Sequence, residues 1–257
     1  MSPGRDAAPD PADEFRDIDY PDLLQPGVDF EIDTPANGVQ PTAAPTRREL
    51  SPAPVIADRV SYARNDRTIL DAVSVLVQPG ESLAVVGPSG SGKSSLLAVL
   101  AGLERPDSGS VRRGCDREGL ILQGYGLVSV LSAAENVEVP LQAGVLGSLP
   151  PPVVRVTAAA ALESVGLAAV ADHLIEELSG GQQQRVAIAR AVAVDPDVVF
   201  ADEITAELDH EWKDRVVDLL LDVARRGGIV VLATHDPQIA ARCSTIVRLV
   251  DGRVVGA

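Results

Sequence analysis

The chain has 257 residues and a formal net charge of −15, and aromatic residues make up only 3% of it. Such acidity argues against a protein that coats nucleic acid, because phosphate neutralisation requires lysine and arginine. Two cysteines without metal-type spacing favour a reduced, cytoplasmic protein. The sequence has no secretory pattern and no run of 18 apolar residues, so we expect any membrane contact to be made through a partner.

Residues 1–54 are rich in Pro, Asp, Ala and Gly and have no sustained periodicity. Too few apolar side chains are present to offset the roughly 1–2 kcal/mol of backbone entropy lost per ordered residue. We therefore predict a disordered acidic tail over 1–54 and an ordered domain over 55–257. Whether this tail is only solvated, or contains a partner-binding segment at Phe15–Tyr20, stays open.

Two apolar stretches, 55–62 and 68–77, have the composition of strands and are joined by a polar turn at Asn65-Asp66. Tyr62 would end the first strand beside a loop, where an exposed ring could stack on a nucleotide base. The alternative is that Tyr62 has only a structural role.

A glycine-rich loop follows, with the pattern G-x-x-x-x-G-K-S between an apolar strand at 82–86 and an apolar helix at 95–100. Backbone N–H groups and the helix dipole at such a junction favour a bound polyphosphate. Lys93 would contact the β- and γ-phosphates, and the Ser94 hydroxyl would ligate Mg²⁺. The alternative is an ordinary connecting loop. The predicted nucleotide-binding residues here are Gly87, Pro88, Ser89, Gly90, Ser91, Gly92, Lys93, Ser94 and Ser95.

The middle of the chain changes from strand to helix. A short strand at 119–122 ends in Gln123, and helices are expected at 132–143 and 153–165 with a Gly/Pro-rich break between them. This insertion into an alternating strand–helix pattern predicts a helical subdomain at about 127–177.

Three further segments place polar groups after apolar strands or at a helix start. Ser179 is a good N-cap for a helix that begins with two glycines, although a plain cap explains it equally well. Asp202 and Glu203 follow a buried strand at 198–201, where Asp202 could hold Mg²⁺ and Glu203 could deprotonate water. Paired acids at a strand end can also be merely solvated. His235 follows the strand at 229–233 and could bond a γ-phosphate oxygen.

Together these residues resemble the ATP-binding cassette family, the ATPase subunits of ABC transporters, over roughly Val55–Val255. The resemblance implies an α/β fold, in which a P-loop NTPase core sheet is flanked by helices and joined by an antiparallel β subdomain and a helical subdomain. It implies a second Mg²⁺ contact and a catalytic role for Gln123, a catalytic switch role for His235, and adenine stacking by Tyr62. It adds as nucleotide-binding residues the signature residues Ser179, Gly180, Gly181 and Gln182, and Asp209 of the D-loop.

The same resemblance implies ATP and Mg²⁺ as ligands, a head-to-tail dimer with a second ATPase subunit, and a membrane permease as partner on the cytoplasmic face. The stretch at 133–141 resembles the lipoprotein-releasing and macrolide-exporter branch. One departure is the short interval between Lys93 and Gln123, which predicts a reduced antiparallel β subdomain or loss of the helix after it. Two alternatives remain: a cassette ATPase acting on DNA or ribosomes, and a scaffold that braces or signals through a membrane complex without transport.

Overall fold

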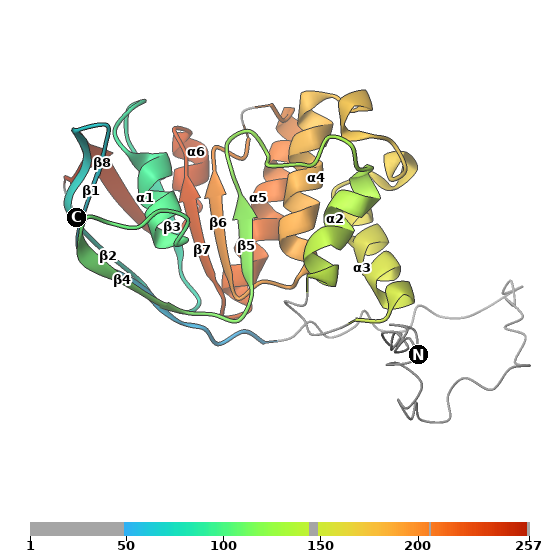
Figure 1. Ribbon diagram of the computed structural model, residues 1–257, viewed down its shortest axis with the longest axis horizontal. Helices are drawn as coiled ribbons and strands as arrows, with labels where there is room; N and C mark the ends of the chain where they lie inside the picture. The colour runs from blue at the N-terminus through green and yellow to red at the C-terminus, as the bar shows by residue number, and fades with distance from the viewer. Residues whose placement is uncertain (1–48, 144–148, 206, 256–257) are drawn as a thin grey trace, which may run out of the picture. The chain divides into compact units, whose positions relative to one another are not determined.

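Two β-sheets organise the computed structural model, which describes residues 49–143, 149–205 and 207–255 (Figure 1). The predicted tail lies outside the described residues up to residue 48. The central sheet has the strand order β5-β6-β7-β3-β8-β9, and all its pairings are parallel except the β8–β9 hairpin. Its strands are β3 (Ser82–Val86), β5 (Glu118–Ile121), β6 (Val198–Asp202), β7 (Ile229–Ala233), β8 (Thr245–Val250) and β9 (Arg253–Val254).

The second sheet is antiparallel with the order β2-β1-β4. Its strands are β1 (Ala53–Arg64), β2 (Arg67–Val77) and β4 (Ser108–Gly114). Asn65 and Asp66 make the turn between β1 and β2 with φ values of 51° and 59°, as a tight hairpin requires. After β4 only residues 115–117 precede β5, and no helix follows α1 in this described stretch. The fold class predicted from the sequence, including the small antiparallel subdomain, is confirmed.

The helices are α1 (Lys93–Leu100), α2 (Ala133–Gln142), α3 (Pro151–Ser164), α4 (Gly180–Ala193), α5 (His210–Arg225) and α6 (Pro237–Ala240), with short 3-10 helices η2 (Ala168–Val170) and η3 (Ile175–Glu177). Helices α2, α3 and α4 pack against one another, on the side of the central sheet away from the antiparallel sheet (Figure 1). Ser132 caps α2 through a capping box with Glu135. The sequence predicts that α3 begins at 153, whereas it begins at Pro151, because proline fits the first turn of a helix.

The core divides along the two faces of the central sheet because strand side chains alternate in direction. On β6, Val199 and Ala201 face the cluster formed with α2–α5, whereas Val198 and Phe200 face the cluster formed with α1 and the antiparallel sheet. Strands β6 and β7 are buried throughout, as parallel strands covered on both faces should be. The carboxyl ends of β3, β6 and β7 consequently meet at one sheet edge.

Two sequence expectations need correction. The folded structure begins before Val55, because Leu50 is only 5% exposed, donates its N–H to the Arg226 carbonyl (2.8 Å) and packs at Gly227-Gly228. The sequence reading also missed β4, an edge strand in which only Val111 is even partly buried. Neither the segment at Leu50 nor β4 has the regular spacing of apolar residues by which a strand or helix is recognised in a sequence.

Candidate functional site

The loop between β3 and α1 encloses the ammonium of its own lysine. Lys93 is 6% exposed, and its Nζ donates to the carbonyls of Gly87 and Pro88, both at 3.0 Å. Gly92 caps α1 with φ 102°, and a Cβ there would lie 2.9 Å from the Ile69 carbonyl oxygen. Glycine is therefore required at this position both for the left-handed backbone and for the close approach of β2.

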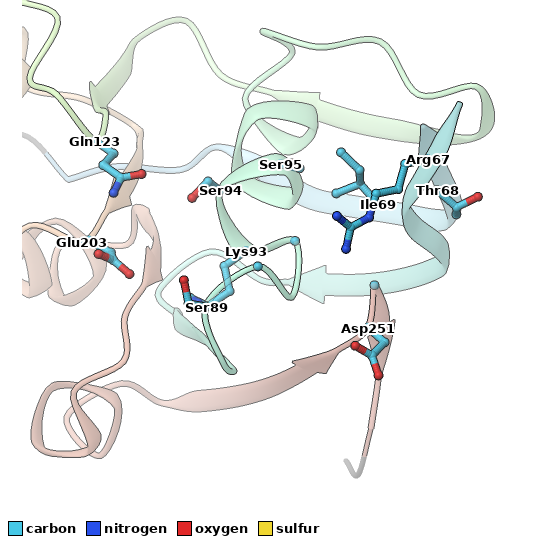
Figure 2. Close-up of a pocket in the computed structure, with 13 residues that line it drawn as sticks. Arg67, Thr68, Ile69, Ser89, Lys93, Ser94, Ser95, Gln123, Glu203 and Asp251 are labelled. Atoms are coloured by element: carbon cyan, nitrogen blue, oxygen red, sulfur yellow. The ribbon is translucent and has the colours of Figure 1, made fainter. Parts of the chain in front are cut away.

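A pocket of about 460 Å³ lies in front of this loop and the start of α1 (Figure 2). Gln123 and Glu203 lie at one end of it, and Arg67 and Thr68 lie beyond Lys93 and Ser94 at the other. The structure thus brings the second half of the predicted phosphate loop together with the predicted residues Gln123 and Glu203. The other predicted residues of these segments are not in the described lining: Gly87, Pro88, Ser91, Asp202 and His235. The described lining consists of Arg67, Thr68, Ile69, Ser89, Gly90, Gly92, Lys93, Ser94, Ser95, Gln123, Glu203, Asp251 and Gly252.

Asp202 ends β6 beside this pocket in a position that suits a cation. It is 6% exposed, and its Oδ1 is buried without a hydrogen-bond partner among the described residues. Burial raises the pKa of the Asp202 carboxyl and the adjacent Glu203 charge adds to this, whereas the Ser94 hydroxyl and Lys93 lower it. A buried, unpartnered carboxylate oxygen beside a hydroxyl is a donor set that Mg²⁺ accepts, so these residues fit the predicted metal.

Glu203 has a strained backbone that other elements hold in place. Its φ is 49°, its N–H donates to the Ala233 carbonyl (3.0 Å), and its carbonyl accepts from Gln184 Nε2 (3.3 Å). His235 Nδ1 lies 3.5 Å from Glu203 Oε1. A non-glycine residue kept at positive φ by neighbouring strands and helices is a common feature of active sites.

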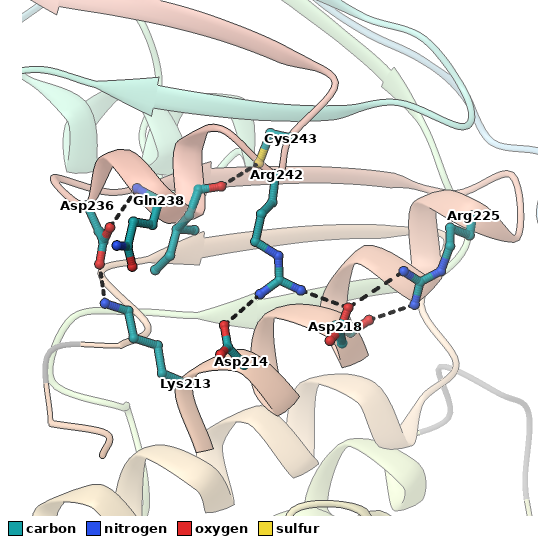
Figure 3. Close-up of polar contacts among 9 residues, drawn as sticks. Lys213, Asp214, Asp218, Arg225, Asp236, Gln238, Arg242 and Cys243 are labelled. Atoms are coloured by element: carbon teal, nitrogen blue, oxygen red, sulfur yellow. Dashed lines mark hydrogen bonds and ion pairs between the residues drawn. The ribbon is translucent and has the colours of Figure 1, made fainter. Parts of the chain in front are cut away.

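The loop that contains His235 is anchored to α5 by ion pairs (Figure 3). Lys213 pairs with Asp236 and lowers the pKa of that carboxyl. Arg242, just after α6, pairs with Asp214 (3.1 Å) and Asp218 (2.7 Å). The Asp236 N–H also donates to Thr234 Oγ1 (3.0 Å), so the backbone on both sides of the histidine is fixed.

The signature residues lie apart from this pocket. Ser179 caps α4, with its Oγ accepting from the Gln182 N–H (3.3 Å) and its N–H donating to Gln182 Oε1 (2.8 Å). A Cβ on Gly180 would collide with the Glu207 carboxylate. None of Ser179, Gly180, Gly181 or Gln182 is among the described residues that line the pocket, and α4 stands away from α1 (Figure 1).

Two further predicted residues have structural contacts that the sequence did not indicate. Asp209 caps α5 by accepting the Trp212 N–H (2.9 Å) and is not in the described lining. The expectation of an exposed Tyr62 ring is wrong: β1 continues to Arg64, and Tyr62 is 8% exposed within the core. Side chains alternate along a strand, and Tyr62 has the inward position.

The sequence reading also missed residues that complete the site. Arg67, Thr68 and Ile69 come from the start of β2, and Asp251-Gly252 from the C-terminal hairpin, so only tertiary structure brings them to the loop. Gln184 could have been found from the sequence. A glutamine among the apolar residues of α4 is expected to be buried only where its amide bonds backbone groups. Gln184 is 2% exposed and also accepts the Glu207 N–H (3.3 Å).

Known proteins resemble this chain over most of the described residues. The family model described as ABC transporter matches residues 70–206. The Escherichia coli protein YbbA, described as an uncharacterized ABC transporter ATP-binding protein, is 42% identical over 212 residues, covering 76% of this chain and 92% of YbbA. LolD of Anaeromyxobacter dehalogenans, described as a lipoprotein-releasing system ATP-binding protein, is 40% identical and covers 84% of this chain and 95% of its own.

A solved structure has the same fold. The ATP-binding cassette MJ0796, described as a dimeric post-hydrolysis state bound to ADP and Pi, superposes with a TM-score of 0.74 at 33% identity, covering 79% of this chain and 97% of that one. Within the described residues, the helices are all too short or too polar to cross a membrane.

Proposed function

The chain belongs to the ABC transporter family as an ATP-binding, ATP-hydrolysing subunit, and from this premise we propose which residues carry each step. The observation that carries the proposal is the convergence of Lys93, the unpartnered Asp202 oxygen and the strained Glu203 on one sheet edge. Ligands of open α/β sheets bind at such an edge, outside the carboxyl ends of the strands.

The loop from Gly87 to Ser95 would bind the phosphates. The first residues of α1 line the pocket, so the positive end of the helix dipole lies there, and the Lys93 ammonium is already confined within the loop. Because Lys93 is buried, its charge acts at low dielectric and its attraction to a phosphate is stronger than at the surface.

Ser94, Asp202 and Gln123 would hold Mg²⁺. Asp202 is the best supported of the three, because its buried carboxylate charge has no other partner at Oδ1. Bound there, the ion would neutralise charge that develops on the β- and γ-phosphate oxygens during transfer.

Glu203 would act as the general base that takes a proton from the attacking water. Its carboxylate lines the pocket at the end where Gln123 lies, and His235 is near enough to orient it or a phosphate oxygen. Gln184 would act as a positioning residue, because it holds the Glu203 carbonyl from the signature helix.

A second copy would complete the site. The signature residues do not line the described pocket of their own chain, and the N-terminus of their helix offers donors suited to a phosphate. We therefore infer a head-to-tail dimer, in line with the dimeric cassettes of the same fold. ATP would lie between the phosphate loop of one copy and Ser179–Gln182 of the other, with Asp209 at the interface.

Membrane coupling would come from a permease that binds the helical subdomain at the cytoplasmic face. The likeness to LolD supports a transporter of the kind to which the lipoprotein-releasing systems belong, with a substrate that this subunit does not identify. A subunit that braces or signals through a membrane complex without transport would have the same nucleotide site. Transport of a substrate by the permease complex, reconstituted with and without ATP, separates these two functions.

Steady-state ATP turnover by the full-length chain tests the catalytic assignment. Glu203→Gln should lower kcat by about 10²–10⁴ because the proton acceptor is lost, while ATP binding is retained. Glu163→Gln, an exposed carboxylate on α3, provides the control and should turn over like wild type. Equal turnover of Glu203→Gln and wild type would show that Glu203 is not the base.

A further inference from the structure

We infer that Arg67 provides the platform on which the nucleotide base stacks, in place of an aromatic ring. This inference rests on the proposed function of the pocket and names the residue that recognises the nucleoside end of its ligand. Tyr62, the expected stacking residue, is buried in the core beneath the antiparallel sheet and does not line the pocket.

No aromatic residue of the described chain reaches this pocket. Phe200 is 2% exposed in the core, Trp212 is covered by the guanidinium groups of Arg185 and Arg215, and Tyr125 packs against the core cluster formed with α2–α5. The described lining contains neither Phe, Tyr nor Trp. Within the described part of the chain, a side chain of a different kind must therefore recognise the base.

The position of the catalytic residues decides which end of the pocket receives the base. Glu203 and Gln123 lie at one end of the pocket, where the γ-phosphate would be cleaved, and Lys93 and Ser94 lie between the two ends, where they would contact the phosphates. The nucleoside must then extend toward the opposite end. Figure 2 shows Arg67, Thr68 and Ile69 at that end, with the Arg67 guanidinium on the pocket side of β2.

The start of β2 is attached firmly to the phosphate loop. The Ile69 carbonyl lies close to both Gly92 and Gly252, where a Cβ would collide with it. The Gly252 N–H donates to the Ser91 carbonyl (3.1 Å), and the Asp71 N–H donates to the Gly252 carbonyl (2.9 Å). Because β2, the C-terminal hairpin and the loop are joined in this way, the backbone at Arg67 has a fixed position relative to the phosphate loop.

The chemistry of arginine suits this position. A planar guanidinium stacks on the face of a purine and adds a cation–π attraction, which a lysine ammonium cannot do with the same geometry. Ile69 would add apolar contact to the base or the ribose. Arg64 pairs with Arg67 across the hairpin but does not line the pocket, and so offers a matched control.

Calorimetric titration of the full-length chain with two ligands tests the inference. The first is Mg-ADP, and the second is ribose 5-diphosphate, which has the same phosphates and ribose but no base. Arg67→Ala should weaken ADP affinity by roughly 5- to 150-fold, the equivalent of one lost stacking contact, and leave ribose 5-diphosphate affinity unchanged. Arg67→Trp should restore ADP affinity, Arg67→Lys should not, and Arg64→Ala should match wild type. Thermal melts confirm that each variant is folded.

Two results would overturn the inference. Equal losses for both ligands in Arg67→Ala would make Arg67 a phosphate ligand, and unchanged ADP affinity would remove it from the site. A wild-type chain that fails to bind ADP would instead contradict the proposed function.

Discussion

Asp202→Asn should stabilise the nucleotide-free protein and yet abolish its response to Mg²⁺. Asp202 is 6% exposed and its Oδ1 has no partner among the described residues, so the folded chain contains a poorly satisfied buried charge. Asparagine has nearly the same size and still leaves a polar atom without a partner there, but it removes the charge, whose burial costs more than that of a neutral group, by an extra amount of about 1 kcal/mol. In a domain of this size 1 kcal/mol corresponds to roughly 2–4 °C, so Tm should rise by about that amount.

The gain should depend on pH with a definite sign. Burial raises the pKa of Asp202 above its ordinary value of 3.8, so the folded state binds this proton more tightly than the unfolded chain. The Asp202 carboxyl therefore lowers the free energy of unfolding once the pH rises above its raised folded-state pKa. Below the ordinary pKa of 3.8 the carboxyl is protonated in both states and has no such effect. The difference in Tm between variant and wild type should be larger at pH 7 than at low pH, and it should disappear as the pH falls to about 4.

Differential scanning fluorimetry without nucleotide, with ATP, and with ATP and Mg²⁺ measures both effects. Wild type should gain further Tm when Mg²⁺ is added to ATP, and Asp202→Asn should not. Asp197→Asn is the control: this equally buried carboxylate accepts the N–H groups of Asp116 and Arg117, both at 3.2 Å, so its neutralisation should lower Tm. A lower Tm for Asp202→Asn together with an intact Mg²⁺ response would refute the reasoning.

Two further variants probe the packing around the site. Leu50→Ala should lower the free energy of unfolding by about 2–5 kcal/mol in urea titrations, because Leu50 is buried, whereas deletion of 1–48 should leave this free energy unchanged. The reverse result would contradict the observed start of the folded domain. Gln184→Ala should lower kcat by roughly 10-fold with little change in ATP affinity, since it releases the Glu203 carbonyl; a purely structural Gln184 would change Tm and not kcat.

The sequence could predict the phosphate loop and its flanking elements because their chemistry is local. The glycine pattern, the β3 strand before it and the α1 helix after it depend on neighbouring residues, and the structure places them as expected. The same holds for Ser179, whose side chain makes the predicted N-cap. The apolar runs of β6 and β7 likewise indicated buried parallel strands.

The base-binding end could not be predicted because it depends on strand register and on distant contacts. Strand β1 extends two residues beyond Tyr62, so Tyr62 lies within the sheet and pairs with Leu70 of β2. Its side chain therefore takes the inward position in the alternation along the strand. Arg67 reaches the pocket because β2 packs on Gly92 and Gly252, residues far from it in sequence. Leu50 was missed for the same reason, since its partners at Gly227-Gly228 lie near the other end of the domain.

The dimer is the central claim, and the oligomeric state of Glu203→Gln tests it most directly. By analytical ultracentrifugation at about 0.15 M salt, where surface repulsion between two acidic copies is largely screened, this variant should be monomeric without nucleotide and dimeric with Mg-ATP. Adding Lys93→Ala should keep it monomeric by removing a phosphate contact. A Glu203→Gln chain that is saturated with ATP and still sediments as a monomer would contradict the shared site.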